Sequence, residues 1–177
     1  MSLETANKKS FCHIRLIVVM GTTGCGKSTI GEELSQRLNA AWLEGDDYHS
    51  AESKEKMAAG IALTDNDRWP WLERLSHSMR ASSDTTVTSC SSLKRSYRDF
   101  MTLHANEQIL FVHLNGSREQ LASRLSARQG HFMNTDLLDS QLKTLEPPDT
   151  DECSFTVDIN ATVNEIVTEI ETAILSA

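Results

Sequence analysis

The sequence lacks the features that mark membrane-spanning, secreted and cysteine-rich proteins. Its longest apolar run, Leu16–Met20, has five residues, whereas a membrane helix needs about 20. The polar segment Met1–Lys9 has no apolar signal-peptide core. The four cysteines form no CxxC pair, so they indicate neither a cysteine-bound zinc nor a redox pair. We therefore expect a cytoplasmic protein with free thiols and no membrane segment.

Basic residues are also scarce relative to acidic ones. The 17 Lys and Arg residues stand against 25 Asp and Glu residues, which gives a net charge of −8. Eight of the acids follow Lys143, the last basic residue, so the first 143 residues carry 17 charges of each sign. A nucleic-acid-binding domain would show a basic excess. The balance therefore excludes a general nucleic-acid partner but leaves local basic clusters that suit small anionic ligands.

What the sequence does contain is the pattern of one α/β domain, residues 1–177. Apolar, β-branched runs alternate with stretches of helical periodicity, which predicts a parallel sheet with helices on both faces, a three-layer fold. All carboxyl ends of such strands meet at one edge, where ligands bind. The five predicted strands are Ile14–Met20, Ala41–Glu44, Thr85–Cys90, Gln108–Leu114 and Phe155–Asp158.

Several helix starts can be predicted from capping residues. The segments 117–120 and 162–165 each fit a capping box, in which a Ser or Thr is followed three residues later by Gln or Glu. Pro70 is expected at the first position of another helix, with Asn66 or Asp67 as its cap.

A glycine-rich loop follows the first predicted strand and opens a helix expected over 28–39. It fits the pattern G-x-x-x-x-G-K-[ST], whose backbone N–H groups and helix N-terminus surround a phosphate. In this pattern Lys27 contacts the β- and γ-phosphates and the Ser28 hydroxyl binds Mg²⁺. The NKxD signature of guanine binding is absent, so ATP is the expected nucleotide. The expected ATP-binding residues here are Gly21, Thr22, Thr23, Gly24, Cys25, Gly26, Lys27, Ser28 and Thr29.

Acidic and basic residues follow the second predicted strand. The segment Glu44-Gly45-Asp46-Asp47-Tyr48-His49 offers a carboxylate that can accept a proton from a hydroxyl group or organise Mg²⁺ and water. An Asp-rich turn without a ligand is the alternative. Farther along, Arg68 carries a planar guanidinium that suits bidentate binding of a carboxylate.

Two basic clusters lie later in the chain. Lys94, Arg95 and Arg98 follow the third predicted strand and suit an anionic ligand, but a solvated helix face explains their spacing equally well. Arg124 and Arg128 are one helical turn apart and share a face. With the glycine-containing stretch after them they suit a lid that closes over a transferring phosphate. An exposed basic helix face is the alternative.

Together these motifs resemble the small gluconate kinases, the P-loop gluconokinase family. The resemblance extends from about Leu16 to Ile170 and rests on the glycine-rich loop and on segments 45–49, 56–57, 63–72, 90–99, 130–133, 140–141 and 145–148. It implies a nucleoside-monophosphate-kinase-like fold with a mobile helical lid at about 118–145. It also implies a homodimer that phosphorylates D-gluconate with Mg²⁺ and ATP, giving 6-phospho-D-gluconate for the pentose phosphate pathway.

The resemblance also implies roles for individual residues. The implied catalytic residues, with Asp46 as the base, are Lys27, Asp46, Arg124 and Arg128. The further residues implied to bind ATP are Arg124, from the lid, and Asp158 and Asn160, in a loop that packs on adenine. The residues implied to line the gluconate side are Asp46, His49, Arg68, Lys94, Arg98, His131 and Gln141. Mg²⁺ is implied to bind Ser28 together with ATP, and to reach Glu44 through water.

Two other functions compete with this one. A related small kinase could act on another acceptor such as shikimate, but the blocks at 67–72 and 130–133 disfavour it. A nucleotide-dependent switch would bind ATP without a small-molecule acceptor. Such a switch would have no use for an acceptor pocket, so the sequence favours an enzyme with two small-molecule substrates. The residues that argue for this pocket are Asp46, Arg68, Lys94, Arg98 and the two lid arginines, Arg124 and Arg128.

Overall fold

The computed structural model describes residues 11, 13–127 and 135–176. Within these residues, one parallel sheet of five strands has the order β2-β3-β1-β4-β5. Each strand predicted from the sequence is present, with boundaries within two residues of those expected, so the α/β class is confirmed. The strands are β1 (Leu16–Met20), β2 (Ala41–Leu43), β3 (Thr86–Ser89), β4 (Ile109–Asn115) and β5 (Ser154–Asp158).

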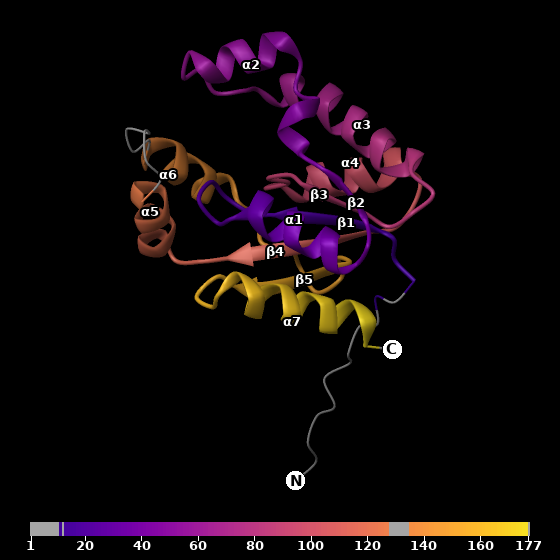
Figure 1. Ribbon diagram of the computed structural model, residues 1–177. Coiled ribbons are helices and arrows are strands. Elements are labelled where there is room, and N and C mark those ends of the chain that lie inside the picture. The colour runs from indigo at the N-terminus through magenta and orange to yellow at the C-terminus, as the bar shows by residue number, and fades with distance from the viewer. Residues whose placement is uncertain (1–10, 12, 128–134, 177) are drawn as a thin grey trace.

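Helices cover both faces of this sheet, which gives the three expected layers (Figure 1). Alternate side chains of β1 point to opposite faces, and all five are fully buried. Ile17 and Val19 pack in one core with apolar residues of helices α1 and α7. Leu16, Val18 and Met20 pack in a second core with residues of α3 and α4. The bounds of these helices are α1 Lys27–Arg37, α3 Asp65–Ala81, α4 Arg95–Ala105 and α7 Val163–Leu175.

Helix α3 begins earlier than the sequence predicted. The Thr64 hydroxyl accepts the N–H of Asp67, and the Asp67 carboxylate accepts the N–H of Thr64, which closes a capping box. The prediction that Pro70 opens this helix is therefore wrong, because the helix starts at Asp65 and Pro70 lies inside it. The two capping boxes predicted at 117–120 and 162–165 are confirmed by their hydrogen bonds.

The remaining elements lie around the carboxyl ends of the strands. A short 3-10 helix, η1 (Gly45–Tyr48), follows β2, and α2 (Ala51–Ala58), which the sequence reasoning missed, projects away from the sheet. Helices α5 (Arg118–Ala127) and α6 (Thr135–Thr144) lie side by side at the end of the molecule where β4 points (Figure 1). Both fall in the predicted lid segment.

The described helices also bear on the predicted absence of a membrane segment. None of those in 13–127 and 135–176 has the length and apolar composition that a membrane crossing requires.

Candidate functional site

The glycine-rich loop turns sharply from the end of β1 into α1. Gly21, Gly24 and Gly26 adopt φ values of 141°, 83° and 98°, a region that residues with a Cβ rarely occupy. A Cβ on Gly24 would lie 2.9 Å from Leu125 Cγ and 3.0 Å from a carbonyl oxygen of α5. The loop therefore has the tight backbone and close helix contact that a phosphate-binding loop needs.

Side chains from the loop and from α5 close onto this turn. Lys27 Nζ donates to the Thr22 carbonyl oxygen at 2.9 Å, so the lysine folds back across the loop. Arg124 Nη1 donates to the Cys25 carbonyl oxygen at 3.2 Å, and Nη2 donates to the Ile159 carbonyl oxygen. The Cys25 side chain is fully buried, so its thiol packs inside the loop while Lys27 and Arg124 flank it.

Helix α6 also contacts the loop, through Gln141. The Gln141 side-chain oxygen accepts the backbone N–H of Thr23 at 2.6 Å. Sequence reasoning placed Gln141 on the acceptor side, and the structure brings it to the phosphate loop instead. Ser28 and Thr29, at the start of α1, are exposed at the same edge.

A cavity of about 180 Å³ lies beside the loop, on the α7 side. Thr29 and Arg124, both predicted for ATP, line it together with two apolar residues of α7 that sequence reasoning missed, Val163 and Ile166. In the sequence both residues belong to the apolar stripe of α7, a pattern that predicts core packing and gives no sign of a ligand. Asp158 and Asn160 are not among the lining residues; Asp158 accepts the backbone N–H of Asn160 at 2.7 Å, in the adjacent loop.

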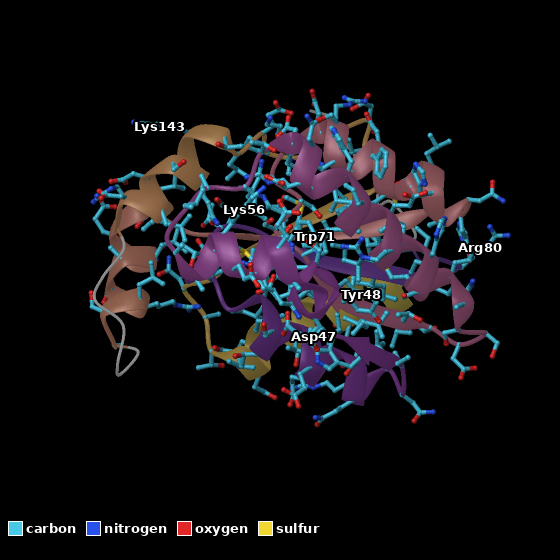
Figure 2. The ribbon with its side chains drawn as sticks, turned by 90° about the horizontal axis from the view of Figure 1, so that it is seen from above. Asp47, Tyr48, Lys56, Trp71, Arg80 and Lys143 are labelled. Atoms are coloured by element: carbon cyan, nitrogen blue, oxygen red, sulfur yellow. The ribbon has the colours of Figure 1, made fainter. Side chains whose placement is uncertain are left out.

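The acidic segment after β2 is held against the sheet by close backbone contact. A Cβ on Gly45 would lie 1.8 Å from the Ser89 carbonyl oxygen, so only glycine fits. The Trp71 indole donates to the Gly45 carbonyl oxygen at 2.7 Å, and the Ser89 hydroxyl donates to the Glu44 carboxylate. These contacts fix η1 between β3 and α3, and Figure 2 shows Trp71 on α3 within this central region.

Asp46 in η1 and His49, which directly follows η1, differ sharply in exposure. The Asp46 side chain is 84% exposed, and its carboxylate accepts no hydrogen bond from the described residues. The His49 side chain is 4% exposed and stacks on Trp71 with ring centres 4.0 Å apart. Burial lowers the pKa of His49, while the nearby charge of Asp46 acts in the opposite direction. His49 is thus a buried, packed ring, and Asp46 is the accessible carboxylate.

The charges of Asp46 and Lys27 both act on the buried Cys90. Burial raises the pKa of the Cys90 thiol, at the end of β3, to about 11. The charge of Asp46 raises that pKa further, while the charge of Lys27 lowers it. β3 pairs in parallel with both β1 and β2, so the loop after β1 and the acidic segment after β2 lie at the same edge of the sheet.

A carboxylate lies between the predicted cations of the acceptor side. Asp65, the first residue of α3, accepts from Arg68 Nη1 at 3.0 Å, Lys94 Nζ at 2.9 Å and the Tyr97 hydroxyl at 2.5 Å. Hydrogen bonds from Tyr97 and Lys94 lower the pKa of Asp65, and Asp65 in turn raises that of Lys94. We call these four residues the acceptor cluster. Sequence reasoning missed Asp65 and Tyr97, although Asp65 precedes Arg68 by one helical turn.

Arg98 does not reach this cluster. Its side chain is 1% exposed, and it forms two hydrogen bonds with the Glu152 carboxylate, at 2.6 and 2.9 Å. Its Nη1 donates to the carbonyl oxygens of Ser92 and Glu146 at 3.0 Å. The prediction that Arg98 lines the acceptor side is therefore wrong, because its guanidinium is consumed in holding the turn after β3. Arg128 and His131, two other predicted residues, lie outside the described residues.

Comparison with known sequences gives consistent results. The sequence profile of the shikimate kinase family matches residues 23–174. The chain is 43% identical to a probable gluconokinase of Xenopus tropicalis, over 88% of this chain and 91% of that one. It is 39% identical to the thermosensitive gluconokinase of Escherichia coli K12, over 90% of this chain and 87% of the relative.

Solved structures show how similar the chain is to a gluconokinase and to a shikimate kinase. A crystal structure of a gluconokinase from Sinorhizobium meliloti superposes with a TM-score of 0.85 at 42% identity, covering 93% of each chain. Shikimate kinase from Aquifex aeolicus superposes with a TM-score of 0.55 at 16% identity, over 89% of this chain and 94% of the other. The second likeness shows a shared fold alone.

The buried ion pair of Arg98 generates the first prediction. Glu152→Ala leaves a buried guanidinium without its counter-ion, which typically costs about 3–5 kcal/mol and lowers the melting temperature by about 10 °C. Asp151→Ala is the matched control, because Asp151 pairs with Arg95 at the surface, where a pair contributes about 0–1 kcal/mol. Urea unfolding of the wild type, Glu152→Ala and Asp151→Ala measures the loss of unfolding free energy in each variant, and thermal unfolding measures the change in melting temperature. If Glu152→Ala instead kept its stability and bound ligand more weakly, Arg98 would have a role in ligand binding and not in stabilising the fold.

Proposed function

The chain belongs to the gluconokinase family, and on that premise we propose that it transfers the γ-phosphoryl group of ATP to D-gluconate, forming 6-phospho-D-gluconate and ADP. The observation that carries the proposal is the arrangement of three parts at one sheet edge. These are the phosphate-type loop, the exposed Asp46 in the segment after β2, and the acceptor cluster, whose cations already hold a carboxylate.

The acceptor cluster provides recognition of the gluconate carboxylate. Arg68 and Lys94 present charged N–H donors to Asp65, and such donors form strong hydrogen bonds with a substrate carboxylate. All three side chains are partly exposed, so an anion from solvent can reach them. Gluconate binds with its carboxylate at Arg68 and Lys94, which directs its far hydroxyl toward the phosphate loop.

Three residues take part in the proposed phosphoryl transfer itself: Asp46, Lys27 and Arg124. Asp46 accepts the proton of the gluconate 6-hydroxyl while that oxygen bonds to the γ-phosphorus and the bond to the ADP oxygen breaks. Lys27 and Arg124 leave their carbonyl partners in the loop and donate to the phosphate oxygens instead. Their positive charges stabilise the charge that spreads over the transferring group.

Mg²⁺ fits the donor groups at this edge. Ser28 offers an exposed hydroxyl at the start of α1, and Glu44 offers a carboxylate oriented by Ser89. Hydroxyl, carboxylate and water oxygens are the ligands that Mg²⁺ prefers. When bound, the ion neutralises charge on the β- and γ-phosphates.

The proposal keeps several features that the family resemblance implied. They are a homodimer in the cytoplasm, a lid that moves over the nucleotide, and contact of Arg128 with phosphate. They also include a gluconate contact at His131 and, when the lid is closed, at Gln141. Asp158 and Asn160 remain proposed for the adenine side, because their loop precedes α7, which borders the cavity beside the phosphate loop.

Coupled ADP release with Mg-ATP tests the function directly. The acceptors are D-gluconate, shikimate, related sugar acids and buffer alone, and we expect release that depends on D-gluconate. Lys27→Ala is expected to abolish release with its melting temperature retained, because it removes only the phosphate-facing ammonium. Release that depends on shikimate alone would move the acceptor, and ATP binding without acceptor-dependent release would favour a nucleotide switch.

Asp46→Asn tests the base. Loss of the proton acceptor is expected to lower kcat by about 10²–10⁴-fold, with the KM values for both substrates changed only a few-fold. Asp47→Asn is the matched control, because Asp47 is an exposed neighbour in the same short helix. Steady-state kinetics of both variants measure the difference. A kcat near that of the wild type in Asp46→Asn would remove Asp46 from this role.

Arg68→Ala tests carboxylate recognition. A charged hydrogen bond contributes about 1.5–3 kcal/mol, so the KM for gluconate is expected to rise about tenfold or more while the KM for ATP stays within twofold. Arg80→Ala is the control, an exposed arginine at the other end of α3 (Figure 2). An equal rise in both KM values would indicate a structural role for Arg68.

A further inference from the structure

Helices α3 and α4 form a continuous seam on one face of the sheet (Figure 1). The seam begins at the acceptor cluster. It continues through Trp69, whose ring lies 5.3 Å from that of Tyr97 and 4.9 Å from that of Phe100, measured between centres. Farther along, Glu73 and His77 of α3 meet His104 of α4. This last contact brings two imidazoles and a carboxylate together, and the proposed phosphoryl transfer uses none of them.

The three side chains converge closely. His104 Nδ1 lies 3.5 Å from Glu73 Oε1, and the ring centres of His77 and His104 are 5.9 Å apart. One ligand-type atom from each residue lies within 4.8 Å of the other two. Glu73 and His77 are four residues apart and therefore share a face of α3. The His104 ring stacks on Phe100 with centres 4.0 Å apart, which holds it in the seam.

We propose that Glu73, His77 and His104 bind a divalent transition-metal ion of the Zn²⁺ class. Two imidazole nitrogens and one carboxylate oxygen are a common Zn²⁺ ligand set, with bonds of about 2.0–2.2 Å. Because the three ligand atoms lie within 4.8 Å of one another, small side-chain rotations bring all three to bonding distance from one ion. Glu73 and His104 are partly exposed and His77 is exposed, so water completes the coordination.

The donor set also determines which ion binds. Mg²⁺ requires near-octahedral oxygen ligands, whereas imidazole suits Zn²⁺, Ni²⁺ and Cu²⁺. The site is therefore chemically distinct from the proposed nucleotide-bound Mg²⁺. It is also distant from the acceptor cluster, because His77 lies twelve positions after Asp65 in α3, a rise of about 18 Å. The ion contacts no substrate and instead joins α3 to α4 at the end of the seam opposite the acceptor cluster.

Calorimetric titration of the chelator-treated, nucleotide-free full-length protein with ZnCl₂ tests the site. We expect one Zn²⁺ per chain and no comparable binding of MgCl₂. At a free Zn²⁺ concentration ten times its Kd, the melting temperature is expected to rise by about 2–5 °C, because the ion binds only the folded state.

Variants identify the ligands. His77→Gln, His104→Gln and Glu73→Gln are each expected to weaken Zn²⁺ binding about tenfold or more, and His13→Gln, at an exposed histidine outside the cluster, to leave it unchanged. The melting temperatures of the metal-free variants check that each is folded. Because His77 is exposed, His77→Gln is the variant expected to disturb the fold least. Failure of the wild type to bind Zn²⁺ would overturn the proposal. So would equal Zn²⁺ affinity in the wild type and in folded His77→Gln and Glu73→Gln.

Discussion

The central strand β1 has no solvent-facing side, and the architecture follows from that constraint. Its five side chains are fully buried, and both of its edges pair with neighbouring strands. Burying an apolar strand on both faces requires a helical layer on each side. Parallel neighbours require crossovers that return every chain segment to the same edge. The phosphate-type loop, the acidic segment and the start of α4 consequently meet at the carboxyl ends of β1, β2 and β3.

Sequence patterns predicted this framework well because strands and helices of the core are specified by local periodicity. They located helix α3 less well. Pro70 indicated a helix start from its ring geometry alone, but the reciprocal bonds between Thr64 and Asp67 satisfy two backbone N–H groups and start the helix five residues earlier, at Asp65. Pro70 is the sixth residue of this helix and lacks the N–H that would bond to the Asn66 carbonyl oxygen, so the helix forms in spite of one lost backbone bond. Capping outweighed the proline, and no single-residue preference shows that in advance.

The sequence predicted which types of residue gather at the candidate site, but it did not predict which residues pair with one another there. A basic residue near a ligand edge can face the ligand or pair with an acid distant in sequence, and Arg98 does the latter. Its counter-ion, Glu152, lies 54 positions away, beyond any local pattern. Arg68 and Lys94 reach the expected edge, yet Asp65 stands between them. Only the three-dimensional packing of α3 against α4 decides which arginine becomes structural and which stays accessible to an anion.

Within the site, groups suited to substrate already have partners from the protein. Lys27 donates to Thr22, the Thr23 N–H to Gln141, Arg124 to Cys25, and Arg68 and Lys94 both donate to Asp65. An unpaired donor in a half-buried cleft would be costly. Under the proposed function, ligand binding therefore exchanges one acceptor for another instead of filling vacant positions. The exchange at Thr23 is the most consequential, because phosphate can take that N–H only if Gln141 withdraws. Gln141 belongs to α6, so nucleotide binding at this N–H requires the Gln141 side chain to release the loop.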